Sequence, residues 1–194
     1  MKNLILLLTL AGCLLASCKK SGEPDEKDKS YPEERPLQAY FQNSGLDQNI
    51  EEFPDMRDTE LGLRFTPKVK GKITAVTVRL PQSSTSVRVT IWNATTKHVL
   101  RTIIVPTVVA AEEVIQTFDA LSIEPGTNYA ISIRSDNWYH REKSPRAAIA
   151  YPINAGNFLI QGYGWGSGSG QTFPDEDTFD YYTGEAGFIF QQMP

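Results

Sequence analysis

The stretch VTVRLPQSSTSVRVTIW, residues 76–92, decides the fold class because apolar residues recur at every second position on both sides of a polar segment. Successive side chains of a β-strand point to opposite faces, so this spacing indicates two strands rather than a helix. The apolar faces would carry Val76, Val78, Leu80, Val87, Val89 and Ile91. Arg88, Thr90 and Trp92 would occupy the opposite face of the second strand.

Similar short apolar runs continue toward the C-terminus, at residues 99–105, 114–118, 129–133, 147–151, 157–161 and 187–191. Turn chemistry bounds them, as at 93–96 and at 124–128, where proline and glycine favour a chain reversal. We expect no helical stripe longer than a turn or two. The sequence therefore predicts an all-β fold, an antiparallel β-sandwich of the jelly-roll or immunoglobulin-like type.

Residues 37–194 have the length expected of one domain. A domain of this size buries roughly 70% of the surface that its unfolded chain exposes. Both cysteines precede it in the sequence, so it contains no pair to oxidise. We therefore expect a single β-sandwich domain that is stabilised by its packed core.

Residues 1–18 are typical of a lipoprotein signal peptide, since Lys2 and an apolar run lead to Leu15-Ala16-Ser17-Cys18. The run is too short for a spanning helix, which needs roughly 20 apolar residues. The last four residues resemble the box of bacterial lipoproteins, whose cysteine is acylated after cleavage. Leu10-Ala11-Gly12-Cys13 matches the same pattern, but cleavage there would leave a short apolar core and an apolar mature end. We therefore expect Cys18 to carry the lipid that attaches the protein to a membrane.

Residues 19–36 are mostly charged or proline, a composition that favours a disordered tether. The acidic residues within 23–28 also resemble a surface-export address of Bacteroides-type lipoproteins, but the sequence favours a solvated spacer. We expect a lipid-anchored protein of the outer membrane, at the cell surface or the periplasmic face. The net charge is -4 without a basic stripe, which argues against nucleic acid as a partner.

A series of motifs in the middle of the chain falls in the order of a known family. They are ELGLRFT at 60–66, GKITAV at 71–76, TIWN at 90–93, VL at 99–100 and IEPGTNYA at 123–130. Over about residues 58–140 the chain resembles the 4082 family of bacterial domains of unknown function. The resemblance implies a β-sandwich found in secreted, carbohydrate-associated proteins. The chain departs from the family pattern at 79–84, where a glycine-rich aromatic strand is usual.

Three aromatic residues of these motifs are expected to have structural roles. Phe65 and Trp92 would fill the core. Tyr129 follows a proline-glycine turn and resembles the tyrosine corner of immunoglobulin-type sandwiches, whose hydroxyl bonds to upstream backbone.

Two aromatic segments are the candidate ligand-binding residues. Trp138, Tyr139 and Arg141 would lie in one loop, and Tyr163 and Trp165 in a flexible, glycine-rich one. Flat rings stack on the C–H faces of sugars while nearby polar groups bond the hydroxyls, so these rings predict glycan binding if they are exposed together. The alternative is that the same rings pack a second sheet or form a protein interface.

Metal binding and catalysis have weaker support in the sequence. The acidic segment 174–180 suits calcium by ligand type, but it fails the EF-hand template, so a solvated loop is favoured. His98 and His140 belong to no recognisable catalytic or metal motif. The carboxylate pairs Asp136 with Glu142 and Asp175 with Asp180 are the candidates for glycosidic acid–base chemistry, whose separations sequence alone does not give. We expect no cofactor, no metal and no enzyme activity.

These observations predict a cell-envelope lipoprotein that acts as a non-catalytic binding module for a glycan or another extracellular ligand. The alternative is a structural or adhesin-like subunit that binds a surface protein, and a glycan-active hydrolase is the least favoured function. Exposure of Trp138 and Trp165 distinguishes the first two hypotheses, because a binding module needs these rings at its surface.

Overall fold

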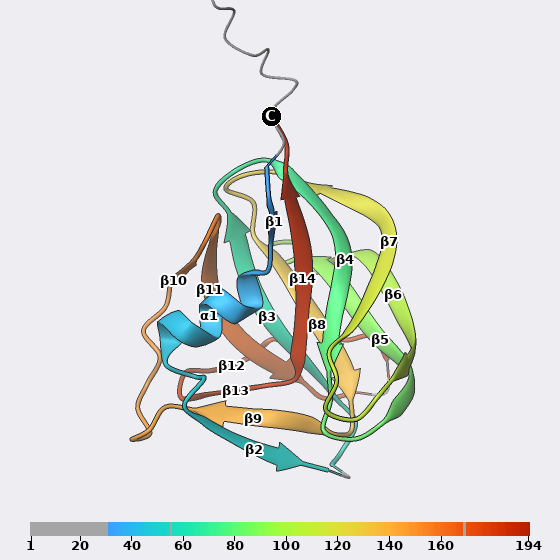
Figure 1. The fold of residues 1–194 in the computed structure, drawn as a ribbon, viewed down its shortest axis with the longest axis vertical. Coiled ribbons are helices and arrows are strands. Elements are labelled where there is room, and N and C mark those ends of the chain that lie inside the picture. The colour runs from blue at the N-terminus through green and yellow to red at the C-terminus, as the bar shows by residue number, and fades with distance from the viewer. Residues whose placement is uncertain (1–30, 55, 169) are drawn as a thin grey trace, which may run out of the picture.

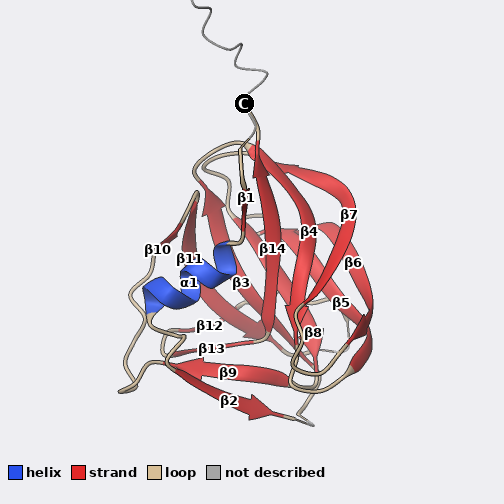
Figure 2. Cartoon of the chain, viewed as in Figure 1, coloured by secondary structure: helices blue, strands red, loops and turns tan. Residues whose placement is uncertain are grey.

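The computed structural model describes residues 31–54, 56–168 and 170–194. The predicted signal peptide, both cysteines and residues 19–30 of the predicted tether lie outside the described residues. Among these residues strands dominate, with one short helix and several antiparallel sheets (Figures 1 and 2). The predicted all-β sandwich is therefore confirmed. No helix among the described residues has the length and apolar character needed to cross a membrane.

Two large sheets and one small sheet make up the fold. The largest has the order β10 (Ile153–Ala155), β11 (Phe158–Gly166), β3 (Thr59–Pro67), β8 (Tyr129–Ser135), β5 (Ser84–Asn93) and β6 (His98–Val108), with β12 (Glu176–Thr178) paired to β11. The second has the order β1 (Glu33–Glu34), β14 (Glu185–Gln192), β4 (Gly71–Arg79) and β7 (Val114–Ile123). The third has the order β13 (Tyr181–Thr183), β9 (Trp138–Glu142) and β2 (Asn49–Phe53), and β9 and β2 run across the lower end of the larger sheets in Figure 1.

The core lies between the two large sheets. Phe65 on β3 packs against Phe188 on β14 with ring centroids 4.6 Å apart, and Phe158 on β11 packs against Phe190 at 4.8 Å. The alternating residues of the deciding stretch are buried here as predicted: Val76, Val78, Leu80, Val87, Val89 and Ile91. Each such side chain contributes about 1.5–3 kcal/mol of hydrophobic free energy, which explains why the period-two pattern specifies the fold.

Trp92 is buried, but outside this core. Its strand places it on the outer face of the seven-stranded sheet, beside Ser132 of β8, whose Oγ accepts a 2.8 Å hydrogen bond from the indole Nε1. The Phe173 ring covers it at 5.6 Å in an edge-on arrangement. The prediction that Trp92 is buried in a structural role is therefore confirmed, but a chain segment on the outer face buries it and it does not belong to the cluster between the two large sheets.

Tyr129 forms the predicted corner. Its hydroxyl accepts a 3.1 Å hydrogen bond from the backbone N–H of Glu124, five residues upstream. The intervening turn contains Gly126 at φ 75°, a left-handed conformation that glycine adopts without a Cβ clash.

The ordered domain begins before residue 37. Glu33–Glu34 pairs with β14 as strand β1, and α1 (Pro36–Ser44) follows directly. Proline suits the first turn of a helix, and Gly45 at φ 78° ends it. The sequence reasoning missed this helix, and it extended the tether over residues that the structure places in β1 and at the start of α1.

Candidate functional site

The two predicted loops are strands. Trp138, Tyr139 and Arg141 belong to β9, and Tyr163 and Trp165 belong to β11. The loop prediction for GYGWG failed because its glycines recur at every second position and therefore share one face of a strand. The segment at residues 170–178, here named the strap, lies against that face: a Cβ on Gly164 would meet the Pro174 carbonyl oxygen at 2.7 Å. The glycines thus leave room for the strap.

Three of the predicted rings meet in one depression of about 380 Å³, here named the aromatic hollow. Trp138 comes from β9, and Tyr163 and Trp165 come from β11. The remaining lining residues are Phe53, Met56, Arg57, Thr59, Leu61, His140, Tyr181 and Thr183. The hollow therefore lies where the three-stranded sheet meets the end of the largest sheet.

The rings of the hollow differ in accessibility. Tyr163 is 1% exposed and Trp138 is 9% exposed, so they form its floor and wall. The expectation that a binding module has both Trp138 and Trp165 at its surface is therefore wrong for Trp138. Phe53, Trp165 and Tyr181 are half-buried and present ring surface to solvent. His140 joins two of these rings, with its centroid 5.2 Å from Phe53 and 5.0 Å from Tyr181. Sequence reasoning missed Phe53 and Tyr181, which no local motif singles out.

Tyr163 is held in place from within the domain. Its hydroxyl is hydrogen-bonded to the Thr183 Oγ1, and burial raises the pKa of the Tyr163 hydroxyl well above its usual value. Its ring lies 5.0 Å from Tyr182, which is also fully buried. Tyr163 is thus a neutral support for the hollow and presents almost no surface to a ligand.

Tyr139 and Arg141 point to the other face of β9, so the structure does not bring them into the hollow. Arg141 Nε donates a 2.6 Å hydrogen bond to Glu185 Oε1, and its guanidinium lies 4.1 Å from the Phe41 ring centroid. Arg79 covers the Tyr139 ring at 4.6 Å. Burial raises the pKa of Glu185, while Arg141 and then Arg79 act in the opposite direction. These contacts are part of the domain's own packing.

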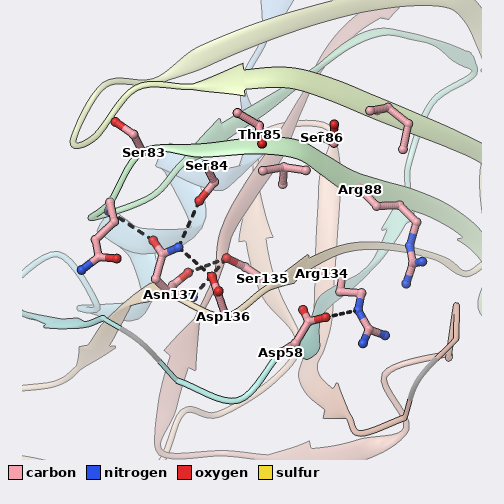
Figure 3. Close-up of a pocket in the computed structure, with 13 residues that line it drawn as sticks. Asp58, Ser83, Ser84, Thr85, Ser86, Arg88, Arg134, Ser135, Asp136 and Asn137 are labelled. Carbon is pink, nitrogen blue, oxygen red and sulfur yellow. Dashed lines mark hydrogen bonds and ion pairs between the residues drawn. The ribbon is translucent and has the colours of Figure 1, made fainter.

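A second depression, about 610 Å³ and mostly polar, lies on the outer face of the seven-stranded sheet and is here named the polar pocket (Figure 3). It is lined by Asp58, Gln82, Ser83, Ser84, Thr85, Ser86, Val87, Arg88, Ile104, Arg134, Ser135, Asp136 and Asn137. Asn137 fixes one wall: its Oδ1 accepts a 3.1 Å bond from the Gln82 N–H, and its Nδ2 donates to Ser84 Oγ at 3.1 Å. Hydroxyl, amide, carboxylate and guanidinium groups therefore converge here.

Arg88 and Arg134 occupy directly opposed positions on β5 and β8. Arg88 Nη2 donates to Glu60 Oε2 at 2.8 Å, and Arg134 Nε donates to Asp58 Oδ2 at 2.6 Å. Arg134 Nη1 also donates to the Gly170 carbonyl at 2.7 Å. Each guanidinium is thus paired with one carboxylate, and the two like charges stand side by side at little electrostatic penalty.

A third depression of about 480 Å³ shares lining residues with each of the other two. It shares Arg57 with the aromatic hollow, and Asp58 and Arg134 with the polar pocket. Its remaining lining residues, Ser167 and Gly168, follow directly after the last residue of β11. The three depressions together are named the groove. Aromatic surface lines one end of it, and hydrogen-bonding groups line the other.

The acidic segment 174–180 anchors the strap and the turn that follows it. Asp175 is paired with Lys97 at 2.5 Å, Asp177 with Arg64, and Asp180 with Arg146 at 2.7 Å. The hydrogen bond from Arg146 lowers the pKa of Asp180. Among the described residues, no group of three or more His, Cys, Asp or Glu side chains is placed to hold a metal ion.

The candidate catalytic groups do not form a common site. Asp136 lines the polar pocket, whereas Glu142 accepts a hydrogen bond from Asn49 on β2. Asp175 is paired with Lys97, and Asp180 with Arg146, so they belong to separate ion pairs. His140 lines the aromatic hollow, and His98 is exposed at the start of β6.

The fold and the groove define an all-β sandwich domain whose surface carries neighbouring aromatic and polar depressions. The model of one family, described as a domain of unknown function (DUF4082), matches residues 47–183. The chain belongs to this family. The matched range contains every residue that lines the groove, and it leaves out α1 and β14. A search of the curated proteins finds no match.

Proposed function

We propose that this chain is a cell-envelope lipoprotein that is anchored through Cys18 and binds a glycan without cleaving it. The N-terminal sequence supports the anchor, since its apolar run ends in a lipoprotein-type box. The charged residues that follow would hold the sandwich domain away from the lipid surface, at the outer membrane's cell-surface or periplasmic face.

The observation that carries this proposal is the aromatic hollow. Trp165, Phe53 and Tyr181 present ring surface around one depression, and Trp138 forms its wall. Aromatic faces bind the C–H faces of sugar rings, and polar groups at the rim select the hydroxyl pattern. Arg57 and Thr59 stand at this rim. A sugar ring would stack on Trp165 and donate or accept hydrogen bonds at these two residues.

A different observation favours the alternative function, binding of a surface protein. Apolar side chains are exposed on two edge strands, with Val99, Leu100 and Ile104 on β6 and Ile115 on β7. Edge strands offer unpaired backbone groups to a partner strand. Pro106 has no backbone N–H and so interrupts the row of hydrogen-bond donors along β6, which limits pairing with a partner strand. Glycan binding is therefore the better-supported function.

A glycan array tests the proposal with two matched ring variants. Trp165→Ala removes a half-buried ring of the hollow, whereas Phe179→Ala removes a ring that is 54% exposed and lies outside the residues lining the groove. We expect the first variant to lose its glycan signals and the second to bind like the wild type. Identical array profiles for all three proteins would contradict the proposal. Shortening of a bound oligosaccharide during incubation would instead indicate a hydrolase.

A further inference from the structure

We propose that the polar pocket is a second subsite of the groove, which binds uncharged, hydroxyl-rich sugar units. These units would belong to the same oligosaccharide as the sugar that stacks in the aromatic hollow. This inference rests on the proposed glycan binding and specifies its ligand. The domain would then bind the interior of a neutral polysaccharide, because a single sugar cannot fill both ends of the groove.

The first argument is the continuity of the groove. The third depression shares Asp58 and Arg134 with the polar pocket and Arg57 with the aromatic hollow. Two chain segments also contribute residues to both the polar pocket and the aromatic hollow, or link residues that line them. Asn137 lines the pocket and Trp138 the hollow, and the Met56 N–H donates to the Asp136 carbonyl at 2.5 Å. A linear ligand that passes Arg57 and Asp58 at the end of the sheet would therefore reach from one depression to the next.

The second argument is charge balance. Each arginine of the pocket is paired with a carboxylate, Arg88 with Glu60 and Arg134 with Asp58. Asp136, which is exposed in the pocket, adds a negative charge. A uronate carboxylate would therefore meet acidic neighbours without an unpaired cation in the pocket itself, and the transfer of its charge from water would be poorly compensated.

The third argument is the match of hydrogen-bonding groups. Thr85 and Ser86 are exposed in the pocket, and their hydroxyls, which both donate and accept, form no side-chain hydrogen bond with the described residues. Across the pocket, Asp136 offers carboxylate oxygens beside Ser135 and Asn137 (Figure 3). Neighbouring hydroxyls of a neutral sugar are themselves donors and acceptors, so they satisfy such a set without bringing a charge.

Isothermal titration of the full-length protein in detergent micelles tests the inference. The probes are neutral gluco-oligosaccharides and oligogalacturonides, each as disaccharide and hexasaccharide. We expect the neutral hexasaccharide to bind about tenfold or more tightly than the neutral disaccharide, a difference of ~1.4 kcal/mol. The galacturonide hexasaccharide should bind more weakly than the neutral hexasaccharide, because the polar pocket has no unpaired cation for its carboxylates.

Variants locate the effect in the polar pocket. Asp136→Ala should remove most of the hexasaccharide's advantage and leave disaccharide binding unchanged, while Asp119→Ala, at an exposed acidic position on β7, should change neither. Asp136→Lys should raise the affinity for the galacturonide hexasaccharide severalfold, since it supplies the missing cation.

The outcomes separate this inference from the proposed function. Equal affinity for the neutral disaccharide and hexasaccharide, or an unchanged length dependence in Asp136→Ala, would overturn the second subsite. The glycan-binding function would still stand in that case if disaccharide binding depends on Trp165. A preference of the wild type for galacturonides would overturn the neutral-ligand assignment. Absence of binding for every probe would contradict both proposals.

Discussion

Replacing Arg141 by methionine separates a structural arginine from a ligand-binding one. The Arg141 side chain is only 7% exposed and is bonded to the Glu185 side chain, which is 6% exposed. Its Nη1 also donates to the Leu46 carbonyl at 3.3 Å, which ties β9 to the chain that follows α1. Methionine keeps much of the aliphatic volume, so the Arg141→Met variant removes the charge and its hydrogen bonds with little change in packing.

The expected loss is about 3–5 kcal/mol of the free energy of unfolding near neutral pH, because the Glu185 carboxylate stays buried without its main partner. Arg79 reduces this loss only slightly, since its Nη1 lies 3.6 Å from Glu185 Oε2 and is partly exposed. Loss of the cation–π contact with Phe41 adds to the destabilisation.

The destabilisation should depend on pH with a definite sign. Burial already raises the pKa of Glu185 in the wild type, and removing Arg141, which acts against that shift, raises it further. The folded-state pKa then lies above the unfolded value of about 4.3. Protonation of Glu185 therefore favours the folded variant at low pH, and this stability is lost as the pH rises through the folded-state pKa.

Urea unfolding at a series of pH values, followed by far-ultraviolet circular dichroism, measures both effects. The variant should be least stable relative to the wild type near neutral pH and should recover part of the difference as the pH falls toward 4. The double variant Arg141→Met/Glu185→Met should regain most of the lost stability, because no unpaired charge remains. A loss below about 1 kcal/mol, or one that is the same at every pH, would refute this reasoning.

Other parts of the account make separate predictions. Gly62→Ala should lower the free energy of unfolding by about 1–3 kcal/mol, because the added Cβ would collide with Pro174 of the strap, whereas Gly170→Ala, which meets no atom within 4 Å, should be near neutral in the same urea titration. Burial raises the pKa of the Tyr151 hydroxyl to about 12, so it should ionise at a higher pH than exposed tyrosines in an ultraviolet absorbance titration. The folded state should lose stability as the pH rises from about 10, the pKa of an exposed tyrosine, to about 12. Cys18→Ser should release the protein from the membrane fraction while Cys13→Ser should not; equal release by both variants would contradict the choice of acylated cysteine.

The fold follows from local patterns to a large extent. Alternation at Val87, Val89 and Ile91 predicts a strand because burial on one face is the main source of its stability. The helix at Pro36–Ser44 escaped prediction since its buried side chains, Leu37, Tyr40 and Phe41, form too short a stripe to stand out from a polar segment. Trp92 lies outside the core between the sheets because alternation places it on the opposite face of β5. Its burial there was not predictable, since the strap that covers it comes from a distant part of the chain.

The candidate site was only partly predictable. Trp138 and Trp165 were found because aromatic residues beside polar ones and glycines stand out in a sequence. Alternate residues of β9 point to opposite faces, so Arg141 lies on the face away from the hollow. A loop prediction does not assign residues to faces, so it could not separate Arg141 from the rings. The polar pocket depends on Asp58, Arg88 and Arg134, which come together only through the pairing of β3, β8 and β5. Such a constellation has no local motif.

The most direct test of glycan binding in the aromatic hollow uses the indole N–H signals of the three tryptophans in a ¹H–¹⁵N correlation spectrum. Trp165 and Trp138 line the hollow, whereas Trp92 donates its indole N–H to Ser132 beneath the strap and is an internal control. Titration with a neutral oligosaccharide should shift the Trp165 signal most, the Trp138 signal less and the Trp92 signal very little. Saturable binding that leaves the Trp165 signal unmoved would contradict the account.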